Sequence, residues 1–94
     1  MSHAVVRVKV AEIGQFWRVF ETDGKALREK YGSRGVRAYR EIGRADSVVL
    51  EFEWDPEDIA RFLADPEVKT TMQRGGALGA PEFTLVEPIG ELAA

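Results

Sequence analysis

The sequence contains no cysteine and one histidine in 94 residues. Without cysteine the chain cannot form a disulfide, a thiolate metal site or a thiol nucleophile. A single histidine argues against a zinc or transition-metal centre, because such centres usually combine several histidine or cysteine ligands. We therefore predict that the protein binds no metal and uses no cofactor.

Long apolar runs and a large net charge are also missing. No apolar run approaches the roughly 18 residues that a membrane-spanning helix needs. Residues 1–5 lead into a strand pattern and lack the charged and then apolar segments of a signal peptide. The formal net charge of −3 provides no basic field to attract nucleic acid or anionic lipid. We expect a cytoplasmic protein that binds neither nucleic acid nor membranes.

The composition that remains is typical of a globular protein. Hydrophobic residues make up 45% and charged residues 31% of the chain. We predict a single domain over residues 1–94, with a loose tail at 89–94. A domain of this size buries only about 60–65% of the surface that its unfolded chain exposes. Pairing with a second copy would bury more apolar surface.

Strand patterns occupy three segments of the first half. Residues 4–12 place valines at every second position on one face, with Arg7 and Lys9 on the other. This period of two predicts a strand. Residues 36–42 and 47–54 predict two further strands, and the short turn between them is typical of an antiparallel hairpin.

Helical patterns occupy the segments between the strands. Residues 13–31 place apolar side chains at helical spacing, and Thr22-Asp23-Gly24 predicts a kink or a short break within them. Asp55-Pro56-Glu57 and Asp65-Pro66-Glu67 each combine an N-cap aspartate, a proline at the first helical position and an acidic first turn. Each of these triplets therefore predicts the start of a short helix.

A glycine-rich stretch, Gly75-Gly76-Ala77-Leu78-Gly79, precedes the last predicted strand at residues 82–87. A dinucleotide-binding fingerprint must follow a strand and open a helix, whereas this stretch follows a helix and leads to a strand. We predict a helix stop and a flexible connection, with a mobile flap over a pocket as the alternative.

The element order β-α-β-β-α-β predicts a ferredoxin-like α+β fold. Right-handed crossovers place both helical segments on one face of a four-stranded antiparallel sheet, with the first and third strands at its centre. The apolar faces of these two strands then pack under the helices. On the opposite face we expect Arg7 and Lys9 beside Glu51 and Glu53, as a matched ladder of charges.

Nearly the whole chain resembles the dimeric α/β-barrel superfamily, which includes small proteins of the antibiotic-biosynthesis monooxygenase type. The resemblance rests on FWRVF (residues 16–20), GVRAYR (35–40), LEFEWD (50–55), FLADPEVK (62–69) and GGALGAPEF (75–83). It implies a homodimer whose two sheets close face to face, with a ligand site between the helices and the sheet of each subunit. The superfamily includes cofactor-free monooxygenases of aromatic polyketide pathways, polyketide cyclases, lactone isomerases and haem-binding members.

The aromatic side chains are the strongest functional signal. Most rings in so small a domain belong to the core, but tryptophan and tyrosine also carry a polar group that needs a partner, so they often border pockets. On these grounds and on the resemblance, we predict that Trp17, Phe20, Tyr39 and Trp54 line a ligand pocket. The pattern does not decide which face of its strand carries Tyr39.

The remaining side chains that could take part in catalysis or binding do not form a cluster in the sequence pattern. His3 is either a general base or haem ligand, or an exposed side chain near the terminus, and we favour the exposed side chain. Arg37 and Arg40 point to opposite faces of a strand, so they form no basic stripe for nucleic acid. One of these arginines can still recognise an anionic or carbonyl group of a ligand.

Three functions remain open. The first, which we favour, is a small homodimeric protein that binds a small hydrophobic or aromatic molecule and has no assigned activity. The second is a cofactor-independent monooxygenase or cyclase acting on an aromatic or polyketide-like substrate, in which Trp, Tyr or Arg positions a carbonyl or stabilises an enolate. The third is a structural or regulatory dimer without a ligand. The sequence assigns no catalytic residue.

Overall fold

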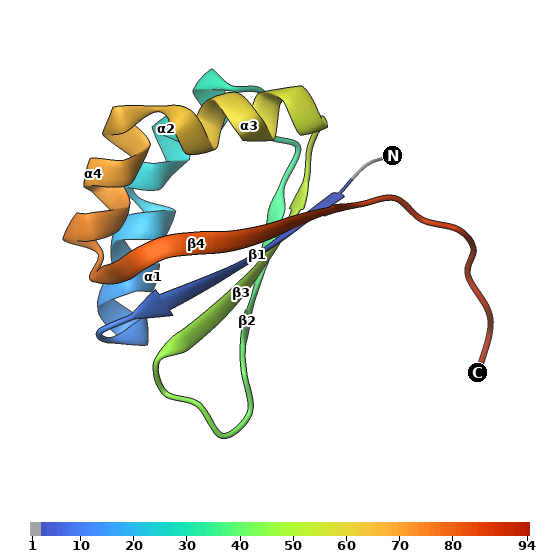
Figure 1. The fold of residues 1–94 in the computed structure, drawn as a ribbon, viewed down its shortest axis with the longest axis horizontal. Helices are drawn as coiled ribbons and strands as arrows, with labels where there is room; N and C mark the ends of the chain where they lie inside the picture. Colours follow the sequence, from blue (N-terminus) through green and yellow to red (C-terminus); the bar gives the residue numbers. More distant parts are fainter. Residues whose placement is uncertain (1–2) are drawn as a thin grey trace.

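The structure is a computed structural model, and it describes residues 3–94 (Figure 1). In chain order its elements are β1 (His3–Val10), α1 (Ile13–Glu21), α2 (Asp23–Lys30), β2 (Val36–Arg40), β3 (Ser47–Glu53), α3 (Pro56–Ala64), α4 (Pro66–Arg74) and β4 (Ala77–Val86). Across the described part of the chain, no helix is long and apolar enough to cross a membrane.

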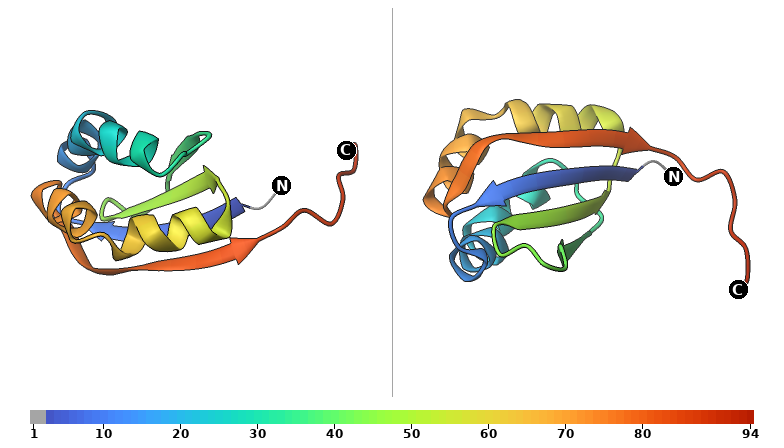
Figure 2. Two further views of the ribbon diagram at one scale, coloured as in Figure 1. Left: turned by 90° about the horizontal axis from the view of Figure 1, so that it is seen from above. Right: turned by 60° about the horizontal axis from the view of Figure 1, so that its bottom comes forward.

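The strands form one antiparallel sheet in the order β2-β3-β1-β4 (Figure 2). The helices cover one face of it, as pairs α1–α2 and α3–α4. The predicted ferredoxin-like α+β fold is therefore confirmed, with β1 and β3 at the centre. Each crossover contains two short helices joined by a single residue, Thr22 in the first and Asp65 in the second.

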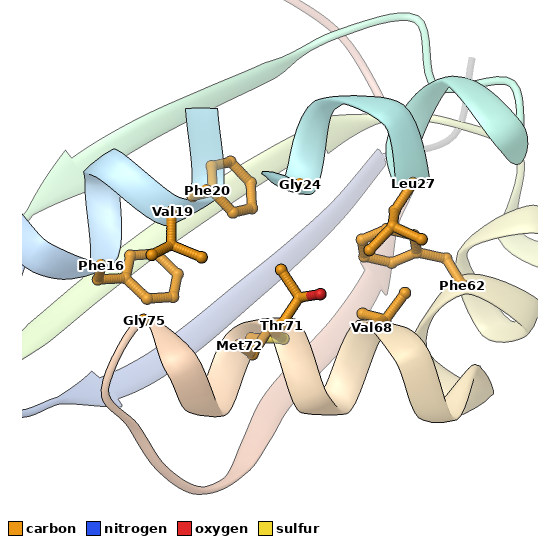
Figure 3. A pocket seen from close by; sticks show the side chains of 10 residues that line it. All are labelled: Phe16, Val19, Phe20, Gly24, Leu27, Phe62, Val68, Thr71, Met72 and Gly75. Carbon is orange, nitrogen blue, oxygen red and sulfur yellow. The ribbon is translucent and has the colours of Figure 1, made fainter. Parts of the chain in front are cut away.

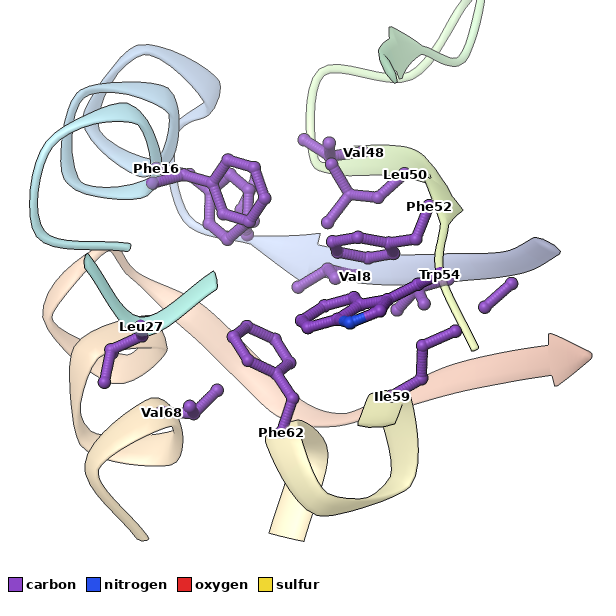
Figure 4. Packing of buried hydrophobic residues seen from close by; sticks show 14 residues of the cluster. Val8, Phe16, Leu27, Val48, Leu50, Phe52, Trp54, Ile59, Phe62 and Val68 are labelled. Atoms are coloured by element: carbon purple, nitrogen blue, oxygen red, sulfur yellow. The ribbon is translucent and has the colours of Figure 1, made fainter. Parts of the chain in front are cut away.

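The core lies between the sheet and the helices, because β1 and β3 alternate as predicted. Their buried side chains are Ala4, Val6, Val8, Val10, Val48, Leu50 and Phe52. The helices add Phe16, Phe20, Leu27, Ile59, Phe62 and Val68 to the same cluster (Figure 4). Each fully buried aliphatic or aromatic side chain of this kind contributes about 1.5–3 kcal/mol.

Trp54 lies at the centre of this core, directly after β3, and its exposed fraction is 0%. Its ring centroid is 4.9 Å from that of Phe62 and 5.6 Å from that of Phe52. The indole Nε1 donates a 2.8 Å hydrogen bond to the backbone carbonyl of Tyr31. Because a buried indole N–H needs an acceptor, this bond attaches the end of α2 to the sheet.

Asp65 separates α3 from α4 and links them to α2. Its Oδ1 accepts a 2.8 Å hydrogen bond from the backbone N–H of Glu67, which caps α4. Its Oδ2 accepts a 2.6 Å bond from the Tyr31 hydroxyl and lies 3.6 Å from the Lys30 ammonium. These contacts, the Tyr31 hydroxyl first, lower the pKa of Asp65, and the same hydrogen bond raises the pKa of Tyr31.

β4 begins at Ala77, five residues before the predicted strand, so the expected flexible connection is largely strand. The pattern concealed this because the pairing with β1 shifts between Arg7 and Lys9 at a bulge. Gly79 takes a φ of +72° there, which glycine adopts without strain. Pro81 is tolerated because β4 is an edge strand. Residues 87–94 follow without regular structure and extend away from the sheet (Figure 1).

The predicted charge ladder on the open face of the sheet is wrong in its register. Arg7 lies opposite Val49, and Lys9 lies opposite Ser47, whereas Glu51 and Glu53 face Val5 and His3. The faces were predicted correctly, but strand alternation alone does not determine which residues stand opposite one another. The acidic partners of Arg7 come instead from the two edges of the sheet.

Those partners are Glu41 and Glu82. Arg7 Nε lies 2.6 Å from Glu41 Oε1, and its Nη1 lies 4.0 Å from Glu82 Oε2. The Ser47 hydroxyl also donates to Glu41, and these contacts, Ser47 first, lower the pKa of Glu41. Arg7 therefore connects the loop after β2 with β4 across the open face.

Replacing Trp54 with alanine is expected to destabilise the fold by about 3–5 kcal/mol, because it removes a large buried ring. The same change at Trp17, whose exposed fraction is 43%, is expected to cost about 1 kcal/mol or less. Urea unfolding followed by circular dichroism measures both. Trp54→Phe keeps the variant folded if the alanine variant is too unstable, and equal losses at positions 17 and 54 would contradict this packing.

The lowered pKa of Asp65 predicts an acid-dependent loss of stability. Since its pKa is lower in the folded state than in the unfolded state, its charge stabilises the fold above the unfolded value, near 3.9, and this contribution fades as pH falls through the folded value. Asp65→Asn keeps a capping side chain but loses the charge. Its urea midpoint should lie below wild type at pH 7 and approach it near pH 3. Glu57→Gln, in the first turn of α3, is the control, and a deficit at Asp65→Asn that does not change with pH would refute this account.

Candidate functional site

An apolar cavity lies between the helix pair α1–α2 and helix α4, above the sheet (Figure 3). It is lined by Phe16, Val19, Phe20, Gly24, Leu27, Phe62, Val68, Thr71, Met72 and Gly75. Its volume is about 20 Å³. A volume of that size holds about one water molecule, so the helices are nearly closed over the sheet in this structure.

Helical spacing brings these side chains to one place. Phe16 and Phe20 are one turn apart on α1, and their rings stack with centroids 5.5 Å apart. Val68, Thr71 and Met72 are three and four residues apart, which places them on one face of α4. Figure 3 shows the two sets facing each other across the cavity. The amphipathic patterns of both helices therefore build opposite walls of the same space.

The break between α1 and α2 forms one end of the cavity. Arg28 Nη1 donates a 2.6 Å hydrogen bond to the Phe20 carbonyl, which has no helical partner after the break. The guanidinium carbon lies 4.4 Å from the centroid of the Phe20 ring, and burial lowers the pKa of Arg28. A Cβ at Gly24 would lie 2.9 Å from Arg28 Nη1, so glycine leaves room for this contact.

Thr71 provides the polar group of the cavity. Its side chain is buried, and Oγ1 accepts a 3.2 Å hydrogen bond from Arg74 Nη2. Arg74 Nη1 lies 3.3 Å from Asp23 Oδ2, so the same guanidinium joins α4 to the start of α2. Within residues 3–94 no acceptor for the Thr71 hydroxyl proton is seen.

The structure separates the four residues predicted to line a pocket. Phe20 lines the cavity, whereas Trp54 is enclosed in the core beside Phe62. Trp17 and Tyr39 both border a shallow groove of about 200 Å³ between α1 and β2. The Trp17 ring contacts the Phe20 ring with centroids 6.1 Å apart, so it supports the cavity from outside. The binding of a ligand by these four residues stays a prediction.

The face that carries Tyr39, which the sequence left open, follows from the strand pairing. Tyr39 lies opposite Val49, and Val49 points to the sheet face turned away from the helices. The exposed fraction of Tyr39 is 48%. It belongs to the open face of the sheet and to the edge groove, and not to the cavity.

Apart from Phe20, the cavity residues were not among the predicted site residues; they are Phe16, Val19, Gly24, Leu27, Phe62, Val68, Thr71, Met72 and Gly75. The spacing on α4 carried a usable signal, since Thr71 shares the stripe of Val68 and Met72. The two glycines gave none, because their contribution is the absence of a side chain where helices approach. A Cβ at Gly75 would lie 3.4 Å from the Val19 Cβ, which shows how closely α4 meets α1.

His3 lies on the open face of the sheet, away from the cavity. It borders a hollow of about 350 Å³ together with Arg34, Arg37, Glu51 and Glu53. Its Nδ1 atom is buried and has no hydrogen-bond partner within the described residues. The same described residues contain no group of three or more potential metal ligands. His3 therefore cannot act on a molecule held beneath the helices.

The chemistry that the cavity offers is almost entirely apolar contact, with the Thr71 hydroxyl at its margin. The two central strands, β1 and β3, contribute only hydrocarbon and aromatic side chains to the helix-covered face. Phenylalanine rings and aliphatic side chains suit a flat apolar molecule, and the Thr71 hydroxyl suits one carbonyl or hydroxyl oxygen. No carboxylate, imidazole or amine is among the residues that line it.

Comparisons with known proteins give matches of structure only. No protein-family model matches the sequence, and no curated protein sequence matches it. SnoaB, a cofactor-independent oxygenase from Streptomyces nogalater, superposes with a TM-score of 0.73 at 22% identity, over 99% of this chain and 97% of that one. An uncharacterized NIPSNAP domain protein from Burkholderia xenovorans gives 0.68 at 18% identity, over 100% of both chains.

A third structure contains a ligand. The monooxygenase from the gene ActVA-Orf6 of Streptomyces coelicolor, in complex with nanaomycin D, superposes with a TM-score of 0.67 at 17% identity, over 99% of this chain and 91% of that one. Identities of this size establish a shared fold and leave activity open. The chain therefore has the ferredoxin-like α+β fold of these oxygenase and NIPSNAP structures, as its resemblance to the dimeric α/β-barrel superfamily implied.

Proposed function

We propose that this protein is a homodimer that binds a small hydrophobic or aromatic molecule between its helices and its sheet. The observation that supports this most directly is the cavity walled by Phe16, Phe20 and Phe62. A protein of the same fold has been crystallised in complex with nanaomycin D. We take residues 1–94 as one domain and propose that the protein acts in the cytoplasm.

The predicted site residues differ in how directly they contribute to the proposed ligand site. Phe20 contacts the ligand directly, since its ring lines the cavity. Trp54 holds Phe62 in place from the sheet side, and Trp17 holds Phe20 from outside. Tyr39 acts through the open face of the sheet, where a partner subunit would meet it.

Holding a ligand requires the cavity to enlarge, so the helices must move apart. Small-molecule pockets usually measure about 300–1,000 Å³, whereas this cavity measures about 20 Å³. The single-residue joints at Thr22 and Asp65 let α2 and α4 rotate without unwinding their neighbours. The bound state is therefore an opened form of the structure described above.

The open face of the sheet supports the proposed dimer. Among its charged side chains lie Val5, Tyr39, Val49, Leu78 and Val86. Tyr39, Leu78 and Val86 are exposed, with fractions of 48%, 54% and 39%. Apolar side chains gathered on one exposed sheet face are typical of an interface, and a second copy would cover them.

The second candidate is a cofactor-independent monooxygenase or cyclase. The fold shared with SnoaB and the Thr71 hydroxyl favour it. The cavity wall offers this chemistry no ionisable group, and for that reason we prefer the binding function. A structural dimer without a ligand is the remaining alternative, and it would retain no molecule in the cavity.

Filling the cavity tests the binding function. Val19→Phe places a ring at the cavity, whereas Glu21→Phe adds the same ring to an exposed position on the same helix. Native mass spectrometry of protein from its own host should detect a retained small molecule in wild type and in Glu21→Phe, and much less in Val19→Phe. Empty wild-type protein, or equal retention in both variants, would argue for a structural dimer.

The molecular mass of the protein in solution tests the proposed dimer. Light scattering at low micromolar concentration should give about twice the chain mass of 10.5 kDa. Val49→Arg introduces an unpaired charge on the open face and should yield monomer, because burying such a charge costs several kcal/mol. Ala60→Arg, on the exposed side of α3, should remain dimeric. A monomeric wild type would remove the dimer from the proposal.

A further inference from the structure

Met72 lies between the cavity and a second, outer space. Besides the cavity, it borders a hollow of about 270 Å³ between α4 and the first half of β4. The remaining lining of this outer hollow is Lys69, Gln73, Ala77, Gly79, Ala80 and Pro81. Met72 is half-buried, packs against the core cluster and is the residue that the two linings share.

The chemistry of methionine suits a movable partition. Its side chain is unbranched and has three rotatable bonds, so it changes rotamer at little cost. The β4 side of the outer hollow is built from small residues, and a Cβ added at Gly79 would meet no atom within 4 Å. The outer hollow of about 270 Å³ therefore leaves room for the Met72 side chain to change rotamer.

The two spaces differ in charge. The inner cavity is apolar, whereas Lys69 and Gln73 bring an ammonium and an amide to the outer hollow. Across residues 3–94 no carboxylate lies within 4.0 Å of the Lys69 ammonium, whereas Arg74 on the same helix is paired with Asp23. The β4 wall of the outer hollow adds no charged side chain. Lys69 is thus the cation that is available to a ligand whose apolar part lies inside.

We propose that Met72 is the gate between these spaces and that the ligand is an amphipathic anion, with an apolar aromatic body inside and its anionic group at Lys69. This inference rests on the proposed binding function and adds to it the ligand class and the entry route. Charge complementarity selects the anion, and the phenylalanine walls select the aromatic body.

A pair of fluorescent probes tests the ligand class. 1-Anilinonaphthalene-8-sulfonate and N-phenyl-1-naphthylamine share their aromatic rings and differ by the sulfonate. Lys69→Met should weaken binding of the sulfonate probe about three- to fivefold, the range of a partly exposed ion pair. It should leave the neutral probe unchanged, and Lys69→Arg should restore the affinity for the sulfonate. Equal effects on both probes would overturn the anion assignment.

Stopped-flow binding of the neutral probe tests the gate. If the open rotamer is a minor state populated at or below about 10%, Met72→Ala should raise the association rate constant about tenfold or more. Met72→Ile, which keeps the bulk but stiffens the side chain, should lower it. Thr70→Ala, on the exposed side of α4, is the control. Circular dichroism checks that each variant is folded.

The outcomes distinguish a failure of the binding function from a failure of the Met72 gate and the anion at Lys69. If wild-type protein binds neither probe, or if Val19→Phe leaves binding unchanged, the proposed binding function fails and this inference fails with it. If Val19→Phe abolishes binding but Lys69→Met and the Met72 variants behave as wild type, the binding function stands and the gate and the anion are overturned.

Discussion

The alternation of side chains along β1 and β3 is the constraint on which the rest of the structure depends. It directs the valines of β1 and the Leu50 and Phe52 side chains of β3 to the same face, and only that face can bury the helices. Trp54 continues the pattern past the end of β3 and uses its indole N–H to hold α2. The cavity, the edge groove and the open face all take their positions from this single choice of face.

The features that the sequence predicted are those that depend on local periodicity. Residue spacings of two to four predict the strand faces, the helix starts at proline and the break at Thr22, and the structure confirms them. The features that the sequence missed depend on contacts between distant segments. The partners of Arg7 and the early start of β4 both follow from the pairing register of the sheet, which loop length and a bulge at Gly79 determine.

The candidate site shows the same division. Phe20 was identified because ring content and helical position point to it, and its place in the cavity follows from the stripe of α1. The sheet face that carries Tyr39 could not be predicted, because in an edge strand it depends on which residue stands opposite in the neighbouring strand. Gly24 and Gly75 carried no signal, since their contribution is room for Arg28 and for α1. Residue types that act by their size leave little trace in a single sequence.

The division of each crossover into two short helices has a consequence for the range of molecules that the fold can hold. α1, α2, α3 and α4 contain 8 or 9 residues each, and every one of them adds its own apolar side chains to the core. Four short helices can each shift separately, whereas two long helices would have to tilt as rigid units. Substitutions in one helix can then change the shape of the cavity while the other helices keep their own core side chains, so the architecture suits divergence toward ligands of different shape.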